Sequence, residues 1–172
     1  KAHPDCFRAD YTITMAALKT GLLLNDAPDV YGEIRTVPIG IPEAFIEKQA
    51  SVRVMEDSDI VRLLGKRLRR ATKHDFGSVG IIGGTAAMAG APALAANACI
   101  AAGAGLVRLY SPTIHPITKL EVMTHSLPVD ERGVITRSAL PLLREAIEKN
   151  TAFVIGPGLG SDEETLDVVR DL

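Results

Sequence analysis

Two glycine-rich segments are the strongest candidates for a ligand site in this chain of 172 residues. The first comprises Gly83-Gly84-Thr85, followed by Gly90 and Ala91, and the second is Gly156-Pro157-Gly158-Leu159-Gly160. Glycine permits positive φ angles and lets a ligand approach the bare backbone, while free amides at a helix start attract an anion such as phosphate. Neither segment is a Walker A motif, and the second is one residue short of G-x-G-x-x-G. Plain strand-to-helix turns without a ligand are the alternative interpretation.

Other residues with reactive side chains form weaker patterns. The four histidines share no metal-ligand spacing with one another or with the two cysteines, so no metal site is predicted. Ser78 and Ser111 lack the context of a nucleophile elbow, and Cys99 lies in an alanine-rich run typical of a small core residue. Lys73-His74-Asp75 could meet a phosphate or a substrate acid, or could simply be solvated.

Composition narrows the class of protein. The chain is 47% hydrophobic and 23% charged, as in a globular domain, and its net charge of −2 with 4% aromatic residues gives no sign of a nucleic-acid partner. Two cysteines favour a reducing compartment, and we expect a cytoplasmic protein.

Residues 79–107 carry no charge, but glycines, Pro92 and Asn97 interrupt them, so no membrane span is predicted. The first residue is Lys1 rather than Met and no signal peptide follows it, so the chain is expected to begin inside a longer protein.

The elements that hold the glycine segments follow an alternating order. Residues 78–82 form a run without alternation that predicts a strand covered on both faces, and residues 106–110 and the apolar run 151–155 predict two further strands. The alanine-rich run 91–102 predicts a helix between the first two strands. Thr136 or Ser138 could cap a further helix, and Ser161 with Glu164 form a predicted capping box after the last strand. This order is typical of an α/β fold with a parallel sheet, whose ligands bind at the carboxyl ends of strands.

The amino-terminal third has a different character. Residues 9–24 predict a strand that runs into a short helix or loop, residues 32–42 predict a second strand, and residues 43–55 are taken as a join. Residues 57–59 offer N-cap groups to an amphipathic helix that extends to Leu68. Its basic face is either solvated or attractive to an anion and carries Lys66, Arg67, Arg69 and Arg70.

The order of these motifs resembles a known family. The first half of the ADP-dependent NAD(P)H-hydrate dehydratase domain, a ribokinase-like fold, is similar to residues 49–172. The end of the NAD(P)H-hydrate epimerase domain, which is fused ahead of the dehydratase in bacterial bifunctional enzymes, is similar to residues 1–48. The dehydratase resemblance is carried by Lys73 to Gly77, Gly83-Gly84-Thr85, Ala89-Gly90-Ala91, residues 101–107 and residues 154–160. The epimerase resemblance is carried by Ala9 to Thr14, Lys19-Thr20-Gly21, Gly32-Glu33 and residues 39–42.

The resemblance implies an apparently truncated three-layer αβα sandwich with a mostly parallel sheet. It implies a lyase that removes water from NADH or NADPH hydrate with ADP or ATP, coupled in the full-length protein to epimerisation of the hydrate. Mg²⁺ for the nucleotide, K⁺ for the epimerase domain at a site outside this sequence, and a homo-oligomer are further implied. The residues implied to bind the hydrate are Gly84, Thr85, Gly90, Ala91, Gly156, Pro157, Gly158 and Gly160. Among them Gly90, Ala91, Gly156 and Gly158 are expected to form the backbone walls of the pocket, by shape and amide donation.

Several family features are absent from the sequence. His74 stands where the family usually has glycine. The epimerase segment Asp-x-Pro-Ser-Gly and the dehydratase segments His-Pro-Gly-Glu, Lys-Gly and Gly-Gly-x-Gly-Asp do not occur, so no catalytic residue is assigned. The 172 residues alone are expected to catalyse neither reaction and to expose an unpaired sheet edge. A ribokinase-like kinase acting on another small molecule, and a non-catalytic nucleotide-binding module, are the alternative functions.

Overall fold

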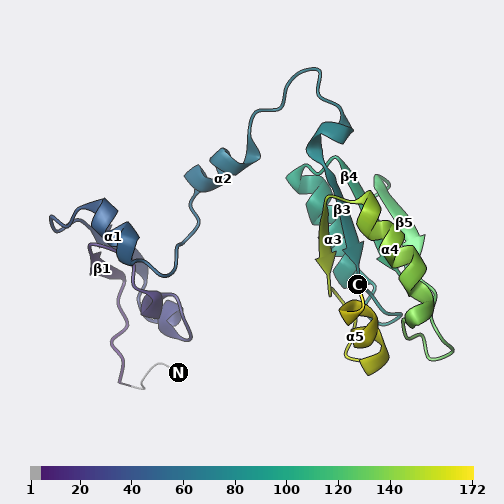
Figure 1. The fold of residues 1–172 in the computed structure, drawn as a ribbon. Coiled ribbons are helices and arrows are strands. Elements are labelled where there is room, and N and C mark those ends of the chain that lie inside the picture. The colour runs from purple at the N-terminus through teal and green to yellow at the C-terminus, as the bar shows by residue number, and fades with distance from the viewer. Residues whose placement is uncertain (1–4) are drawn as a thin grey trace. The chain divides into compact units, whose positions relative to one another are not determined.

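The computed structural model describes residues 5–172, which form two compact units. One unit ends at Lys66, and the other is Arg67–Leu172 (Figure 1). The boundary predicted between residues 48 and 49 was drawn from resemblance to two families, whereas the two compact units meet between Lys66 and Arg67. The family boundary therefore stays a prediction. His3, one of the four histidines considered above, lies outside the described residues.

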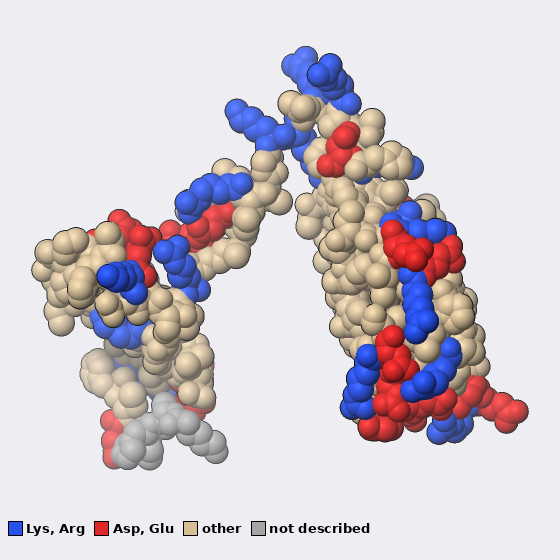
Figure 2. All heavy atoms as spheres, in the orientation of Figure 1, with Lys and Arg blue, Asp and Glu red and all other residues tan. Residues whose placement is uncertain are grey.

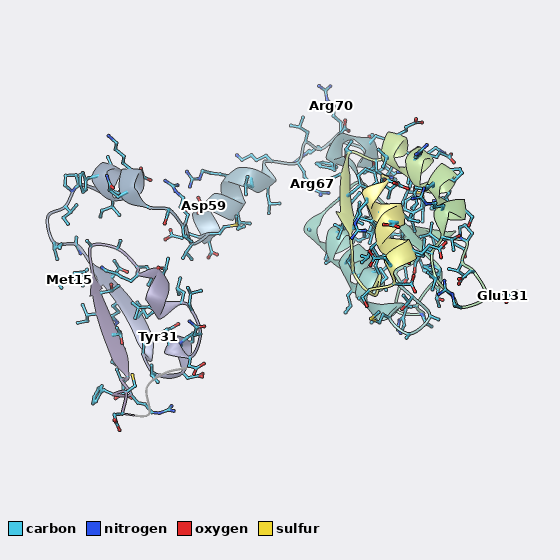
Figure 3. The ribbon with its side chains drawn as sticks, turned by 60° about the horizontal axis from the view of Figure 1, so that its bottom comes forward. Met15, Tyr31, Asp59, Arg67, Arg70 and Glu131 are labelled. Carbon is cyan, nitrogen blue, oxygen red and sulfur yellow. The ribbon has the colours of Figure 1, made fainter. Side chains whose placement is uncertain are left out.

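The first unit is built on a pair of parallel strands. Strand β1 (Tyr11–Met15) pairs with β2 (Glu33–Val37) in a register that sets Tyr11 opposite Glu33. Two 3-10 helices, η1 (Thr20–Leu22) and η2 (Ala27–Asp29), lie between the strands in sequence. Figure 3 labels Met15 at the end of β1 and Tyr31 just before β2. Both predicted strands are confirmed.

Two short helices follow in the first unit. Helix α1 (Glu43–Gln49) occupies part of the segment predicted to be a join, and that prediction missed it. Helix α2 (Asp57–Leu64) begins where predicted, but its N-cap is Glu56, whose backbone N–H donates to the Asp59 carboxylate at 3.0 Å. The helix ends at Gly65, whose φ of 47° breaks the helical path. The predicted extension to Leu68 was therefore wrong.

The second unit contains a parallel four-stranded sheet. Its strands are β3 (Ser78–Ile82), β4 (Leu106–Ser111), β5 (Val122–Ser126) and β6 (Ala152–Ile155), in the order β5-β4-β3-β6. β3 lies inside the sheet and is largely buried, as its continuous apolar sequence requires. Within the described residues β6 pairs with β3 alone, so it presents the predicted unpaired edge.

Helices cover both faces of this sheet and complete three layers. On one face α3 (Gly90–Ala102) packs through Ala96 against Ile81 and Leu109. On the other face α4 (Leu140–Lys149) and α5 (Glu163–Arg170) share a core that includes Ile82 and Leu143. The short helices η3 (Lys73–Phe76) and η4 (Arg137–Ala139) precede β3 and α4. The predicted α/β sandwich with a parallel sheet is confirmed.

The structure corrects two predicted helix caps. Thr136 accepts a hydrogen bond from Ser138 N–H and so caps η4 rather than α4. The N-cap of α5 is Asp162, which accepts from Glu164 N–H at 3.1 Å, so the capping box predicted at Ser161 was wrong. Asp162 is one residue nearer the helix and reaches the same amide.

The uncharged run at 79–107 is not a membrane span. It folds as β3, the first glycine loop, α3 and the start of β4, with Gly103 at a φ of 98° ending the helix. Within residues 5–172, no helix is long and apolar enough to cross a bilayer.

Candidate functional site

The first glycine loop, residues 83–89, leaves β3 at the carboxyl edge of the sheet. Gly84 adopts a φ of +89°, and a β-carbon on it would lie 2.3 Å from the Ser111 hydroxyl oxygen. The turn then closes where Met88 N–H meets both oxygens of Thr85 at 3.2 Å, and α3 begins at Gly90. This tight path needs glycine at position 84 because no L side chain fits there.

The second glycine loop, residues 156–160, leaves the neighbouring strand β6 at the same edge. Gly156, Gly158 and Gly160 all have positive φ angles, of 122°, 68° and 77°. Gly156 N–H donates to the Ile82 carbonyl oxygen at 3.1 Å, and Leu159 N–H donates to the Gly156 carbonyl at the same distance. Within the described residues, the amides of Gly158 and Gly160 have no acceptor and are free to meet a ligand.

The two loops touch each other through their main chains. Gly84 N–H donates to the Pro157 carbonyl oxygen at 2.9 Å. A β-carbon on Gly158 would lie 2.4 Å from the Met88 carbonyl oxygen and 3.4 Å from the Ala91 β-carbon. The structure therefore brings all eight sequence-predicted residues into one region. Six of them do not line the pocket that is described next.

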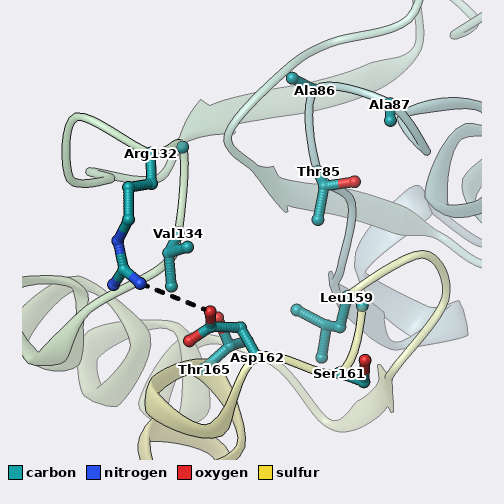
Figure 4. A pocket seen from close by; sticks show the side chains of 11 residues that line it. Thr85, Ala86, Ala87, Arg132, Val134, Leu159, Ser161, Asp162 and Thr165 are labelled. Carbon is teal, nitrogen blue, oxygen red and sulfur yellow. Dashed lines mark ion pairs between the residues drawn. The ribbon is translucent and has the colours of Figure 1, made fainter.

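A cavity of about 240 Å³ opens beside these loops (Figure 4). Thr85 and Gly160, two of the predicted hydrate-binding residues, line it together with Ala86 and Ala87 on one side and Leu159, Ser161, Asp162 and Thr165 on the other. The remaining predicted residues do not line it: Gly84, Gly90, Ala91, Gly156, Pro157 and Gly158. The amide of Gly84 donates to the Pro157 carbonyl oxygen and that of Gly156 to the Ile82 carbonyl oxygen, so neither amide is free to donate to a ligand in this structure. A contact of Gly156 with a ligand would therefore use its shape and not its amide.

The third wall of the cavity was missed from the sequence. It is the turn 130–134, which contributes Arg132, Gly133 and Val134. Asp130 holds this turn, because its carboxylate accepts from Arg132 N–H and Val134 N–H, each at 2.9 Å. The available signal was the spacing Asp130-Glu131-Arg132-Gly133, since aspartate first and glycine fourth is typical of a type I turn.

Charged side chains gather at the rim of this cavity. Arg132 pairs with Asp130 at 2.8 Å, Glu164 at 3.3 Å and Asp162 at 3.8 Å. Acidic and basic side chains are accordingly mixed at the end of the unit that carries α5 (Figure 2). The Val134 amide, followed by Arg132, holds the pKa of Asp130 below its ordinary value against the opposing effect of desolvation, and Asp130 in turn raises the pKa of Arg132.

The remaining candidates do not converge on this site. Asp75 accepts from the backbone N–H and the hydroxyl of Thr72, which lowers its pKa and holds η3 in place. Arg67 lies with its guanidinium 4.0 Å above the Phe76 ring, at the amino edge of the sheet (Figure 3). Cys99, on α3, is half-buried against the core between α3 and the sheet, and burial raises the pKa of its thiol.

The described residues do not fit a resident magnesium site. Within residues 5–172, no group of three or more His, Cys, Asp or Glu side chains is arranged to hold a metal ion. Asp162 and Asp130 are instead occupied by Arg132. We derive no chemical step through a metal held by this chain.

The fold and the site together define a ribokinase-like α/β domain. A ribokinase-like superfamily protein from Enterococcus faecalis superposes on 62% of this chain and 35% of its own, with a TM-score of 0.51 and 27% identity. A hypothetical protein from Streptococcus mutans covers 68% of this chain and 41% of its own, with a TM-score of 0.52 and 28% identity.

Sequence comparison identifies the family within that class. The sequence profile of the NAD(P)H-hydrate dehydratase family matches residues 79–172, which is more than half of the chain, and the chain belongs to that family. The bifunctional NAD(P)H-hydrate repair enzymes of Moorella thermoacetica, Salinibacter ruber and Escherichia coli are 34%, 37% and 35% identical to it over 97%, 96% and 90% of its residues. The chain spans about a third of the length of these relatives, at 32%, 32% and 29%.

Proposed function

We propose that this chain supplies the hydrate-binding wall of an NAD(P)H-hydrate dehydratase that uses ADP or ATP. The observation that carries the proposal is the joining of the two glycine loops by the Gly84 N–H to Pro157 carbonyl hydrogen bond of 2.9 Å, beside a cavity at the carboxyl edge of the sheet. Family membership supplies the substrate class. The proposed ligand contacts are the eight glycine-loop residues, of which Thr85 and Gly160 line the cavity and the other six lie in the joined loops outside its lining. The free amides of Gly158 and Gly160 are the proposed donors.

The proposed reaction makes a poor leaving group into a good one. The hydroxyl oxygen of the hydrate attacks the terminal phosphorus of ADP or ATP and loses its proton to solvent, and AMP or ADP leaves. The lone pair of the ring nitrogen then forms a C=N bond as the C–O bond breaks and inorganic phosphate departs. Loss of a proton from the neighbouring ring carbon restores the dihydronicotinamide. The glycine loops contribute by holding the hydrate in place and by presenting fixed amide dipoles, since they carry no acid or base.

The wider assignments rest on the relatives. Their name, bifunctional repair enzyme, supports coupling of this dehydration to epimerisation of the hydrate in a longer protein. Mg²⁺ accompanying the nucleotide phosphates, K⁺ for the epimerase part and a homo-oligomeric, cytoplasmic protein belong to the same proposal.

Titration of the chain with NADH hydrate, followed by addition of ADP or ATP, tests the function. We expect the hydrate to bind, and to bind less tightly after Gly158→Ala. Gly21→Ala, in the first unit and outside the glycine loops, is the control, because a β-carbon there meets nothing within 4 Å. Recovery of nicotinamide absorbance would show that the chain completes the reaction itself. Absence of hydrate binding at millimolar concentration would overturn the proposal.

The same titration separates the two alternatives. A small-molecule kinase would phosphorylate another alcohol with ATP and ignore the hydrate. A regulatory module would bind the nucleotide alone, without the hydrate. The family match at residues 79–172 favours the dehydratase over both.

A further inference from the structure

One guanidinium at the cavity rim holds three carboxylates. Arg132 Nε lies 2.8 Å from Asp130, and its terminal nitrogens lie 3.3 Å from Glu164 and 3.8 Å from Asp162. Figure 4 shows the pair with Asp162 bridging two walls of the cavity, across from Thr85, Ala86 and Ala87. Arg132 is the one cation among the residues that line this cavity.

This cluster does not suit the recognition of a ligand phosphate. Three carboxylates around one guanidinium leave a local excess of negative charge, which repels a further anion. Two nitrogens of Arg132 already donate, Nε to Asp130 and one terminal nitrogen to Glu164. The contacts of Arg132 are therefore better explained by its holding protein segments together.

The segments that Arg132 joins are the missed turn and the end of the second glycine loop. Asp130 belongs to the turn 130–134, whereas Asp162 is the N-cap of α5 and lies two residues beyond Gly160. A second, interior contact joins the same segments, because the Thr165 hydroxyl donates to the Ile135 carbonyl at 3.2 Å. Thr165 is 2% exposed, so removal of the outer contact leaves the core contact in place.

We propose that Arg132 is a positioning residue of this site, which holds the end of the second glycine loop through Asp162 and Glu164 and thereby sets the affinity of the cavity for NAD(P)H hydrate. The inference rests on the proposed function for its ligand. It does not rest on that function for its effect on the loop, which can be measured without any ligand.

The first test compares Arg132→Ala with Arg137→Ala. Arg137 is the matched control, since it pairs with Asp171 at 2.9 Å, is 65% exposed against 63% for Arg132, and does not line the cavity. We expect amide hydrogen exchange across residues 156–164 to accelerate in Arg132→Ala and not in Arg137→Ala. The dissociation constant for NADH hydrate should rise about threefold to tenfold in Arg132→Ala alone, and Arg132→Lys should restore part of it.

A double-mutant cycle then separates positioning from direct contact. If Arg132 acts through the carboxylates, Asp162→Asn with Glu164→Gln should weaken hydrate binding as much as Arg132→Ala does, and the triple variant should weaken it no further. Additive losses, or unchanged exchange and affinity in Arg132→Ala, would overturn the inference. Should the unchanged protein fail to bind the hydrate, the proposed function fails, and the exchange measurement alone decides whether Arg132 holds the loop.

Discussion

Gly84 donates its backbone N–H to the carbonyl oxygen of Pro157 at 2.9 Å, so the two glycine loops share a main-chain hydrogen bond. Gly83 also lies close to Pro157, since a β-carbon on Gly83 would lie 2.2 Å from the same carbonyl oxygen. Such proximity is open only to residues without side chains. The two loops are thus joined main chain to main chain, and we expect a change in one loop to displace the other.

Gly158→Ala should disturb this wall most. Its φ of +68° disfavours an L side chain, and the new β-carbon would lie 2.4 Å from the Met88 carbonyl oxygen. We expect the free energy of unfolding to fall by more than about 2 kcal/mol, measured by urea unfolding. Gly90→Ala, at the start of α3, should be neutral or stabilising by up to about 1 kcal/mol. Equal unfolding midpoints for the two variants would contradict the close contact of the loops.

The sheet could largely be predicted because β3 has a mostly apolar sequence without alternation and β4 is apolar apart from Arg108 and Ser111. Residues 78–82 form β3 as predicted, and the glycines that follow end it at the expected place. Strand β5 was missed because Thr124, His125 and Ser126 make it polar, as the exposed edge of a sheet allows. Helix α1 was missed because it has no buried residue and therefore no apolar face that repeats at helical spacing.

The site could be predicted only in part, for a different reason. Local spacing marked both glycine loops, since each backbone turn needs glycine whatever surrounds it. The turn 130–134 meets them only through the fold, by way of Arg132 and the Thr165 contact to Ile135. A pairing between residues this far apart in the sequence leaves no local pattern, so the third wall of the cavity required the structure.

The two cysteines should react with thiol reagents at different rates. Cys6 is exposed, whereas Cys99, on α3, is partly buried against the core, and burial raises the pKa of its thiol. Because the thiolate is the reactive form, we expect Cys99 to be labelled at least about tenfold more slowly than Cys6 at neutral pH. Cys6→Ser should remove the fast phase, and urea should abolish the difference. A single rate in the folded protein would contradict the burial of Cys99.

The turn 130–134 should weaken in acid. The Val134 amide, and after it Arg132, lower the pKa of Asp130 in the folded protein. A group with a lowered folded pKa stabilises the protein above its unfolded pKa, and this contribution is lost as the pH falls through the folded pKa. Asp130→Asn should therefore destabilise the turn at neutral pH and make little difference at a pH below the folded pKa. Carboxyl NMR titration of Asp130 checks the direction of the shift.

Thr165 and Thr118 offer a matched test of the interior contact behind the cavity. The Thr165 hydroxyl donates to the Ile135 carbonyl at 3.2 Å, whereas the buried Thr118 hydroxyl has no partner within the described residues. Thr165→Val should therefore lower the free energy of unfolding by about 1–2 kcal/mol, because a buried hydrogen bond is lost.

Thr118→Val should be neutral or slightly stabilising, since it removes a hydroxyl that is buried without compensation. Valine fills nearly the same volume as threonine in both variants, so the hydroxyl alone differs. Urea unfolding at one pH compares them directly. If Thr165→Val also accelerates hydrogen exchange in residues 156–164, the interior and the outer contacts hold the same loop. An unchanged unfolding midpoint in Thr165→Val would show that the Thr165 hydrogen bond adds nothing to the contact between the turn and α5.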